Sequence, residues 1–254
     1  MVSLTEAQLA AWVSPILWPF LRVLAVFTSA PIFSSRAFPV RARIGLALLV
    51  AFAAQASLGN QPVISMTSPQ AFGAALQQVG VGLAIGFAVR LVFASVELAG
   101  EVVGFQMGLN FAAFFDPSLN SQSSAVARFY GQMAALLFVV MNGHLWILMV
   151  VVRSFERFPV DENFLAALAR MRLFDLGADL FSSGLWIALP MIGMLIFVNL
   201  ALGIVSRVAP QMNIYAVGFP VTLTAGLIGI TATLPALDQP FVALMERAMG
   251  IFAR

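Results

Sequence analysis

The chain is a succession of long apolar runs separated by short polar stretches. About 20 apolar residues are needed to cross a hydrocarbon core roughly 30 Å thick, and about six runs approach that length. These runs are residues 9–33, 44–58, 71–96, 125–152, 180–205 and 215–237. The pattern predicts an all-α integral membrane protein with about six long apolar helices arranged as hairpins.

Two features of this pattern are unusual for a protein with six membrane spans. Run 44–58 has only about fifteen residues, which is short for a span. The Arg residues divide almost evenly between the two sides that six spans would define, so the positive-inside rule gives no orientation. Both features indicate that some runs are not ordinary spans.

Composition agrees with a membrane protein and excludes several classes of function. The chain is 61% hydrophobic and 9% charged, whereas soluble domains have about 25% charged residues. No polar linker divides residues 1–254, which are therefore interpreted as one domain. Cysteine is absent, the net charge is only +2 and there is no basic block, so we expect no disulfides and no nucleic-acid binding. Residues 1–8 lack a basic segment, so no cleaved signal peptide is expected.

The least ordinary part of the chain is residues 94–124, together with the helix that leads into it. Small residues recur there every four positions, at Gly82 and Gly86 and again at Gly100, Gly104 and Gly108. Residues four apart share one helix face, and glycine on that face lets another backbone approach closely. This close helix packing is expected either within the chain or against neighbouring subunits.

Three charged residues accompany these glycines. Glu97 and Glu101 lie four apart on the same predicted helix, where like charges repel, and Arg90 lies two turns before Glu97. Ionised groups within a membrane need water or a partner of opposite charge. We interpret the three as a buried ion network, with a proton relay as the alternative.

A cluster of aromatic residues follows Gly108, directly before a polar stretch of Ser and Asn. Asp116-Pro117 breaks any helix, because the residue before Pro is pushed out of the α region. The Phe residues either pack into the core or form a hydrophobic constriction that closes a pore by dewetting. The candidate plug or gate residues are Leu109, Asn110, Phe111, Phe114, Phe115, Asp116 and Pro117.

The sequence gives little support to a catalytic function. The chain has one His, no Cys and scattered acidic residues, and it has no phosphate-binding loop. We therefore expect no enzymatic activity, no cofactor and no metal. A secondary transporter for a small solute is the alternative, since Arg90, Glu97 and Glu101 could serve one, but no clear internal repeat supports it.

Three stretches of the sequence carry a resemblance to one family. They are residues 20–47 with Ala30-Pro31-Ile32-Phe33, residues 82–155 with Gly104-Phe105-Gln106-Met107-Gly108-Leu109 and Asn142-Gly143-His144, and residues 209–220 with Ala209-Pro210-Gln211-Met212-Asn213-Ile214. In this order and spacing the chain resembles FliR, a family of flagellar biosynthetic proteins whose relatives include the SpaR and YscT components of virulence type III secretion.

The resemblance implies a non-enzymatic subunit of the flagellar export gate in the bacterial inner membrane, within the flagellar basal body. Such a subunit assembles with FliP-like and FliQ-like subunits, an FlhB-like protein docks on the cytoplasmic side, and unfolded flagellar proteins pass through. Residues 1–175 would form a FliP-like part and residues 176–254 a FliQ-like helical hairpin. The segment of about residues 109–121 would plug the closed channel. Arg22, Arg36, Arg41 and Arg43 are expected to serve assembly contacts or interfacial anchoring.

Overall fold

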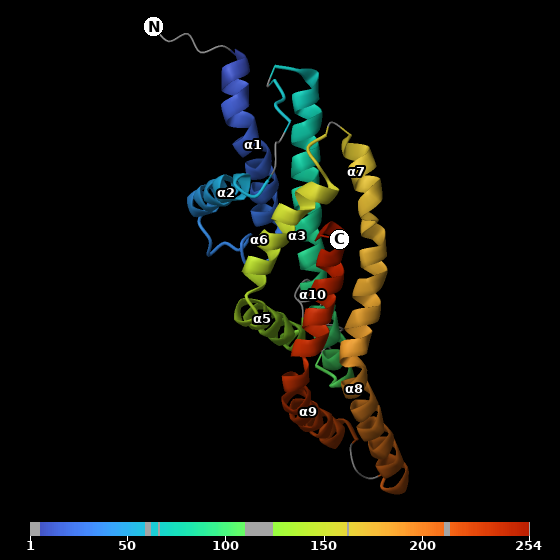
Figure 1. Ribbon diagram of the computed structural model, residues 1–254. Coiled ribbons are helices and arrows are strands. Elements are labelled where there is room, and N and C mark those ends of the chain that lie inside the picture. The colour runs from blue at the N-terminus through green and yellow to red at the C-terminus, as the bar shows by residue number, and fades with distance from the viewer. Residues whose placement is uncertain are drawn as a thin grey trace. The chain divides into compact units, whose positions relative to one another are not determined.

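A computed structural model describes residues 6–58, 62–65, 67–109, 124–161, 163–210 and 214–253, and these residues form helices and no strands. The helices are α1 (Glu6–Ser29), α2 (Val40–Gln55), α3 (Pro69–Gln106), α5 (Ala125–Val140), α6 (Gly143–Arg157), α7 (Phe164–Met171), α8 (Leu173–Val208), α9 (Ile214–Thr233), the short η2 (Leu234–Ala236) and α10 (Asp238–Ala253) (Figure 1). The all-α prediction is confirmed.

Four helical segments in the described chain are long and apolar enough to cross a membrane, or five if one bent helix pair counts as a span. The four are Ala10–Ser29, Pro69–Gln106, Phe164–Val208 and Val217–Ala236. The expectation of about six long helices is therefore approximate. Run 44–58 overlaps α2, whose 16 residues extend only about 24 Å at 1.5 Å per residue.

The apolar run 125–152 is not one straight helix, as the pattern predicted, but the pair α5 and α6, bent by 69°. The break lies at Asn142, which adopts a left-handed conformation with φ 55° and ψ 34°. Asn is among the few residues that tolerate this conformation, which a right-handed helix cannot include. A Cβ at the next residue, Gly143, would lie 2.5 Å from the Phe138 ring, so a larger residue would clash there.

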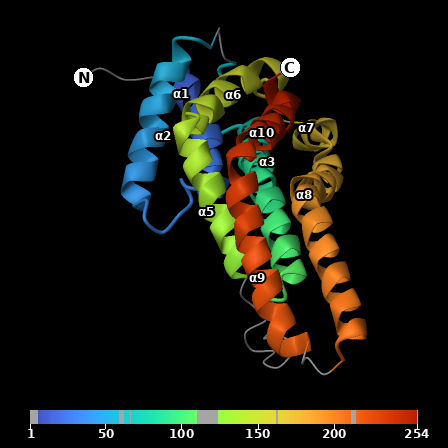
Figure 2. The same cartoon turned by 90° about the horizontal axis from the view of Figure 1, so that it is seen from below.

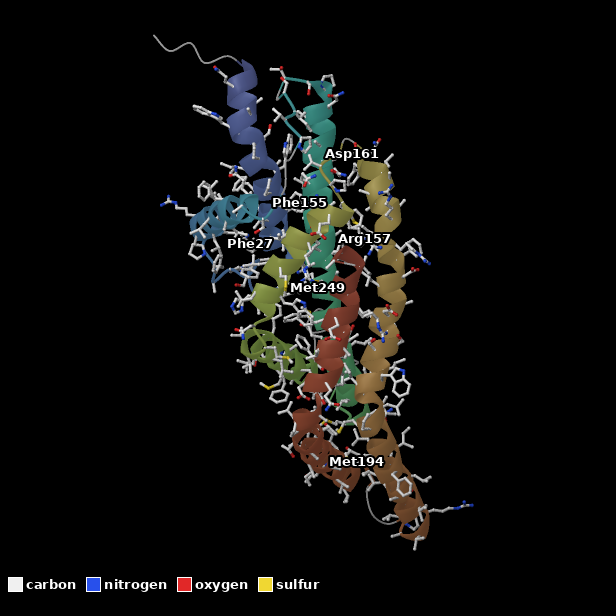
Figure 3. All side chains as sticks on the ribbon, viewed as in Figure 1. Phe27, Phe155, Arg157, Asp161, Met194 and Met249 are labelled. Carbon is white, nitrogen blue, oxygen red and sulfur yellow. The ribbon has the colours of Figure 1, made fainter. Side chains whose placement is uncertain are left out.

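Helix α10 was not predicted, because the last apolar run ends at residue 237. Its buried residues nevertheless follow a helical spacing, with Phe241, Met245, Met249 and Phe252 on one face (Figure 3 labels Met249). Asp238 stands in its first turn, where a negative charge complements the helix dipole. The apolar spacing of three to four residues therefore indicated a helix here, although the segment contains no long apolar run.

The chain divides into two compact units. One comprises Met1–Leu91, Phe138–Gly177 and Met245–Arg254, and the other comprises Val92–Leu137 and Ala178–Leu244. We refer to them as unit 1 and unit 2. Helix α3 contributes residues to both. The expected division near Asp175 into a FliP-like and a FliQ-like part stays a prediction.

Small residues set the packing of unit 1. A Cβ at Gly82 of α3 would lie 2.7 Å from the Cβ of Ala25 on α1, and a Cβ at Gly86 would lie 2.9 Å from the backbone nitrogen of Ala30. Helix α2 contacts α1 and buries Ala47, Ala51 and Ala54. Because these side chains are small or absent, the helix backbones come close together.

Substitution of Gly82 tests this close approach. We expect Gly82→Ala to lower the free energy of unfolding by about 1–3 kcal/mol, because the new methyl group would press on the backbone of α1. The matched control is Gly45→Ala on α2, where no atom lies within 4 Å of the new Cβ, so the better helix propensity of Ala is expected to be neutral or stabilising. Thermal unfolding in a mild detergent, followed by tryptophan fluorescence, measures both. Equal unfolding temperatures for the two variants would contradict the packing described here.

Candidate functional site

A fully buried arginine lies at the centre of unit 1. Arg22 of α1 has no exposed surface, and each of its three guanidinium nitrogens donates a hydrogen bond. Nε donates to Gln78 Oε1 at 2.9 Å, Nη1 to Ser154 Oγ at 2.9 Å, and Nη2 to the carbonyl oxygen of Phe158 at 2.7 Å. One side chain therefore joins α1, α3 and the end of α6.

Further contacts extend this arrangement, which we call the arginine network. The Phe155 ring of α6 (labelled in Figure 3) lies with its centroid 3.6 Å from Arg22 Cζ, a cation–π contact. Gln78 Nε2 donates to Gln77 Oε1 at 2.8 Å, and the same oxygen accepts the backbone N–H of Asp161 at 2.9 Å. The network thus also fixes the turn that follows α6.

The partners of Arg22 are neutral. No carboxylate in the described part of the chain forms an ion pair with Arg22, so hydrogen bonds and the aromatic ring offset the cost of burying its charge. The expectation that Arg22 serves assembly contacts or interfacial anchoring is wrong, because the side chain is enclosed within unit 1. The overlooked signal was Gln77-Gln78, two adjacent amides within an otherwise apolar run.

In unit 2, two of the predicted glycines lie where α3 meets the start of α5. A Cβ at Gly100 would lie 2.8 Å from Ala127 Cα, and a Cβ at Gly104 would lie 3.0 Å from Ser124 Oγ. Ser124 caps α5, since its Oγ accepts the backbone N–H of Ala127 at 3.1 Å. Its own N–H donates to Glu101 Oε2 at 3.1 Å.

Gly108 has a different role from the close packing that was predicted for it. Its φ is +79°, and a Cβ there would be 3.6 Å from Phe219, an ordinary contact distance. The N–H of Gly108 donates to the Phe105 carbonyl and the N–H of Leu109 to the Gly104 carbonyl. This is the Schellman arrangement, in which a left-handed glycine ends the helix. Gly108 thus terminates α3.

The predicted ion network is not buried within the single chain. Arg90 and Glu97 are exposed, and Glu101 is half-buried. The carboxylate of Glu97 lies over Gly131 of α5, where a Cβ would be 2.8 Å from its Oε1. Burial of these groups would require a neighbouring molecule, so the buried ion network stays a prediction.

Most of the predicted plug residues lie outside the described residues: Asn110, Phe111, Phe114, Phe115, Asp116 and Pro117. Leu109 is described and half-buried. The residues that flank the segment are held in unit 2. The Met107 carbonyl accepts a hydrogen bond from Thr222 Oγ1 at 3.3 Å, and the Met107 side chain fills the space over Gly226, where a Cβ would lie 2.6 Å from its Sδ.

Large apolar side chains are exposed along α8 and α9. In the most apolar part of Phe164–Val208 only 17% of the residues are buried, against 61% in α3. Trp186, Phe197 and Val208 each expose more than two thirds of their surface, and Leu227 and Ile228 of α9 more than half. Such surface must be covered by lipid or by other protein.

Metal-ligating side chains do not cluster in the described part of the chain. No three His, Asp or Glu side chains there lie close enough together to hold a metal ion. The single histidine, His144, is half-buried in the first turn of α6. The described helices thus offer an apolar scaffold with internal polar contacts.

Comparison with known proteins identifies the class of this scaffold. Residues 13–248 match the model of the family described as "Bacterial export proteins, family 1", so the chain belongs to this family of bacterial export proteins. It is 42% identical over 243 residues to the flagellar biosynthetic protein FliR of Escherichia coli, covering 95% of this chain and 92% of that protein. It is 40% identical over the same shares to FliR of Pectobacterium carotovorum, and 29% identical to FliR of Bacillus subtilis over 82% of each chain.

Arg22 substitutions test the arginine network. We expect Arg22→Met to lower the free energy of unfolding by about 2–5 kcal/mol, because at least two buried acceptors, Gln78 Oε1 and the Phe158 carbonyl, lose their donors. Arg22→Lys should lose somewhat less, since its ammonium can still donate to some of these acceptors, although it cannot reach all three in the guanidinium plane. The exposed Arg90→Met is the control and should change the stability by less than about 0.5 kcal/mol. Unfolding in a graded detergent series measures all three, and equal effects of Arg22→Met and Arg90→Met would refute the network's role.

Proposed function

We propose that the chain is a subunit of the flagellar type III protein export gate in the bacterial inner membrane. In this proposal it assembles with FliP-like and FliQ-like subunits and contacts an FlhB-like protein. It lines and plugs the channel through which unfolded flagellar proteins leave the cell. The work of the chain is to shape and seal this channel, and the energy for export comes from other components.

Family membership is the observation that carries the proposal. The match extends over residues 13–248, and the relatives that share 40–42% of their residues with this chain are named flagellar biosynthetic proteins. The match therefore includes all or nearly all of each described helix that could cross a membrane. An export role thus draws on nearly the whole chain rather than on one short motif.

The exposed apolar surface supports assembly with partners. Helix α8 has 36 residues, about 54 Å, which is well beyond the roughly 30 Å of a hydrocarbon core. Large apolar side chains continue to its end, where Val208 is 80% exposed. The hydrocarbon core covers only part of an untilted helix of this length, and neighbouring helical subunits can cover the rest.

The flanks of residues 110–123 support a plug between fixed ends. On one side, Gly108 ends α3 in a defined turn and Met107 packs against α9. On the other side, Ser124 caps α5 and is bound by Glu101. We propose that the aromatic residues carried between these ends close the resting channel by excluding water.

Replacing the aromatic residues tests the plug. We expect the combined variant Phe111→Ala, Phe114→Ala, Phe115→Ala to raise resting conductance to small ions by at least about tenfold, because removal of the three rings opens a hydrophobic constriction to water. The measurement is ion leak through the purified assembly in planar bilayers.

The control for this experiment carries the same number of Phe→Ala changes at exposed positions elsewhere that lie on neither α8 nor α9, namely Phe72, Phe87 and Phe129. This control should keep the resting leak of the unmodified assembly. The plug assignment fails if the combined variant leaks no more than the control. Saturable uptake of a small solute by the chain reconstituted alone would favour the transporter alternative instead.

A further inference from the structure

The outward side of α2 is apolar, although no described part of the chain covers it. Leu48, Leu49 and Phe52 are 52%, 65% and 68% exposed, while Ala47 and Ala51 on the opposite side are buried. The sequence of the helix, VRARIGLALLVAFAAQ, has polar residues only near its two ends. A helix in contact with water would carry a polar face, so the medium around α2 is not water.

The geometry of α2 excludes an ordinary membrane span. Its length of about 24 Å falls short of the hydrocarbon core. Its neighbour α1 contains the candidate span Ala10–Ser29. Figure 1 shows α1 upright with α2 nearly end-on, and Figure 2 shows α2 along its length, so the two helices cross steeply. Where α1 spans the bilayer, α2 therefore lies along the membrane plane.

Three arginines stand at the start of α2. Arg36 and Arg41 are exposed and Arg43 is half-buried. The turn that carries Arg36 is held by rings, since Phe33 stacks on Phe27 at 4.6 Å between centroids and meets Phe38 edge-on at 6.2 Å.

This positive charge is not paired with a carboxylate in the described residues. The sequence contains no Asp or Glu between Glu6 and Glu97, and none of the three arginines forms an ion pair within the described residues. A concentration of uncompensated positive charge beside an apolar surface attracts an anionic partner.

The Nε atom of Arg43 in addition lacks an acceptor in the described chain. Its Nη2 donates to the Phe38 carbonyl oxygen at a long 3.5 Å. Its Nε is buried, and no hydrogen-bond acceptor among the described residues reaches it. A buried donor without an acceptor is costly, and a guanidinium suits the oxygens of a phosphate group. Together with the exposed Arg36 and Arg41, the accessible part of the Arg43 guanidinium suits an anion with several oxygens.

We propose that α2 and the turn before it bind anionic phospholipid at the membrane interface. The headgroup phosphates lie against Arg36, Arg41 and Arg43, and the acyl chains contact Leu48, Leu49 and Phe52. A protein partner would have to supply an apolar groove and acidic groups side by side, whereas a bilayer presents both layers at every point of its surface. This function goes beyond export-gate assembly, because it fixes the depth of unit 1 in the membrane.

Lipid retention tests the headgroup contacts. The full chain is purified in a neutral detergent with equal parts of phosphatidylglycerol and phosphatidylcholine, and the lipids retained after washing are quantified by mass spectrometry. Each arginine near an anionic surface contributes about fivefold to partitioning. The combined variant Arg36→Gln, Arg41→Gln, Arg43→Gln should therefore reduce the ratio of phosphatidylglycerol to phosphatidylcholine by at least about tenfold. The control, Arg153→Gln, Arg170→Gln, Arg172→Gln, removes equal charge from a region that contains acidic residues, and it should keep the ratio.

A probe on α2 tests the acyl-chain contacts without altering the arginines. The chain has no native cysteine, so Phe52→Cys can carry a single environment-sensitive fluorophore in vesicles of the same lipid mixture. Spin-labelled acyl chains should quench this probe and aqueous iodide should not, whereas a probe at Asp161→Cys in the exposed turn after α6 should show the reverse. The proposal is overturned if the two triple variants retain the same lipid ratio, or if iodide quenches the Phe52→Cys probe and spin-labelled chains do not.

Discussion

The close approach of backbones along α3 is the constraint on which the rest of the structure depends. In an apolar environment, large hydrophobic side chains pack against lipid as readily as against other helices, so they do not select a neighbour. Glycines do select a neighbour, because they let another backbone come close. On α3, Gly82 lies against α1 and Gly100 lies against α5. Gln78, which binds Arg22, lies one turn before Gly82 on the same face. The arginine network thus forms where the missing side chain brings α1 close enough for a guanidinium to reach.

The apolar pattern predicted much of this fold, because a helix that crosses a membrane consists of one continuous run of apolar residues. Helices α1, α3, α8 and α9 each coincide with a predicted run. The apolar pattern did not predict the bend at Asn142, since apolar residues continue on both sides of it; the overlooked signal was the dipeptide Asn142-Gly143, a sequence that marks turns. Nor could it reveal α10, whose signal is spacing rather than length.

The candidate site was predictable in part. Stacked glycines indicated close contacts, and the structure places tight contacts at Gly82, Gly86, Gly100 and Gly104. Gly108 has the same spacing but ends α3 instead. The difference is its positive φ, which the spacing of glycines in the sequence does not reveal. Arg22 was misassigned because a single charged residue in an apolar run can be either an anchor at the membrane surface or a buried hydrogen-bond donor. Only the position of Gln78 and Ser154, far away in sequence, decides between them.

Exposure separates the helices into two classes, and this separation links the structure to the proposed function. Helix α3 is mostly enclosed by the chain itself, whereas α8 and α9 leave most of their apolar surface uncovered. The central claim is that neighbouring export-gate subunits cover that surface. Native mass spectrometry of the tagged chain, extracted gently from its own membrane, tests it most directly. The account predicts a complex of fixed composition that contains FliP-like and FliQ-like subunits, and a single chain surrounded only by lipid and detergent would contradict it.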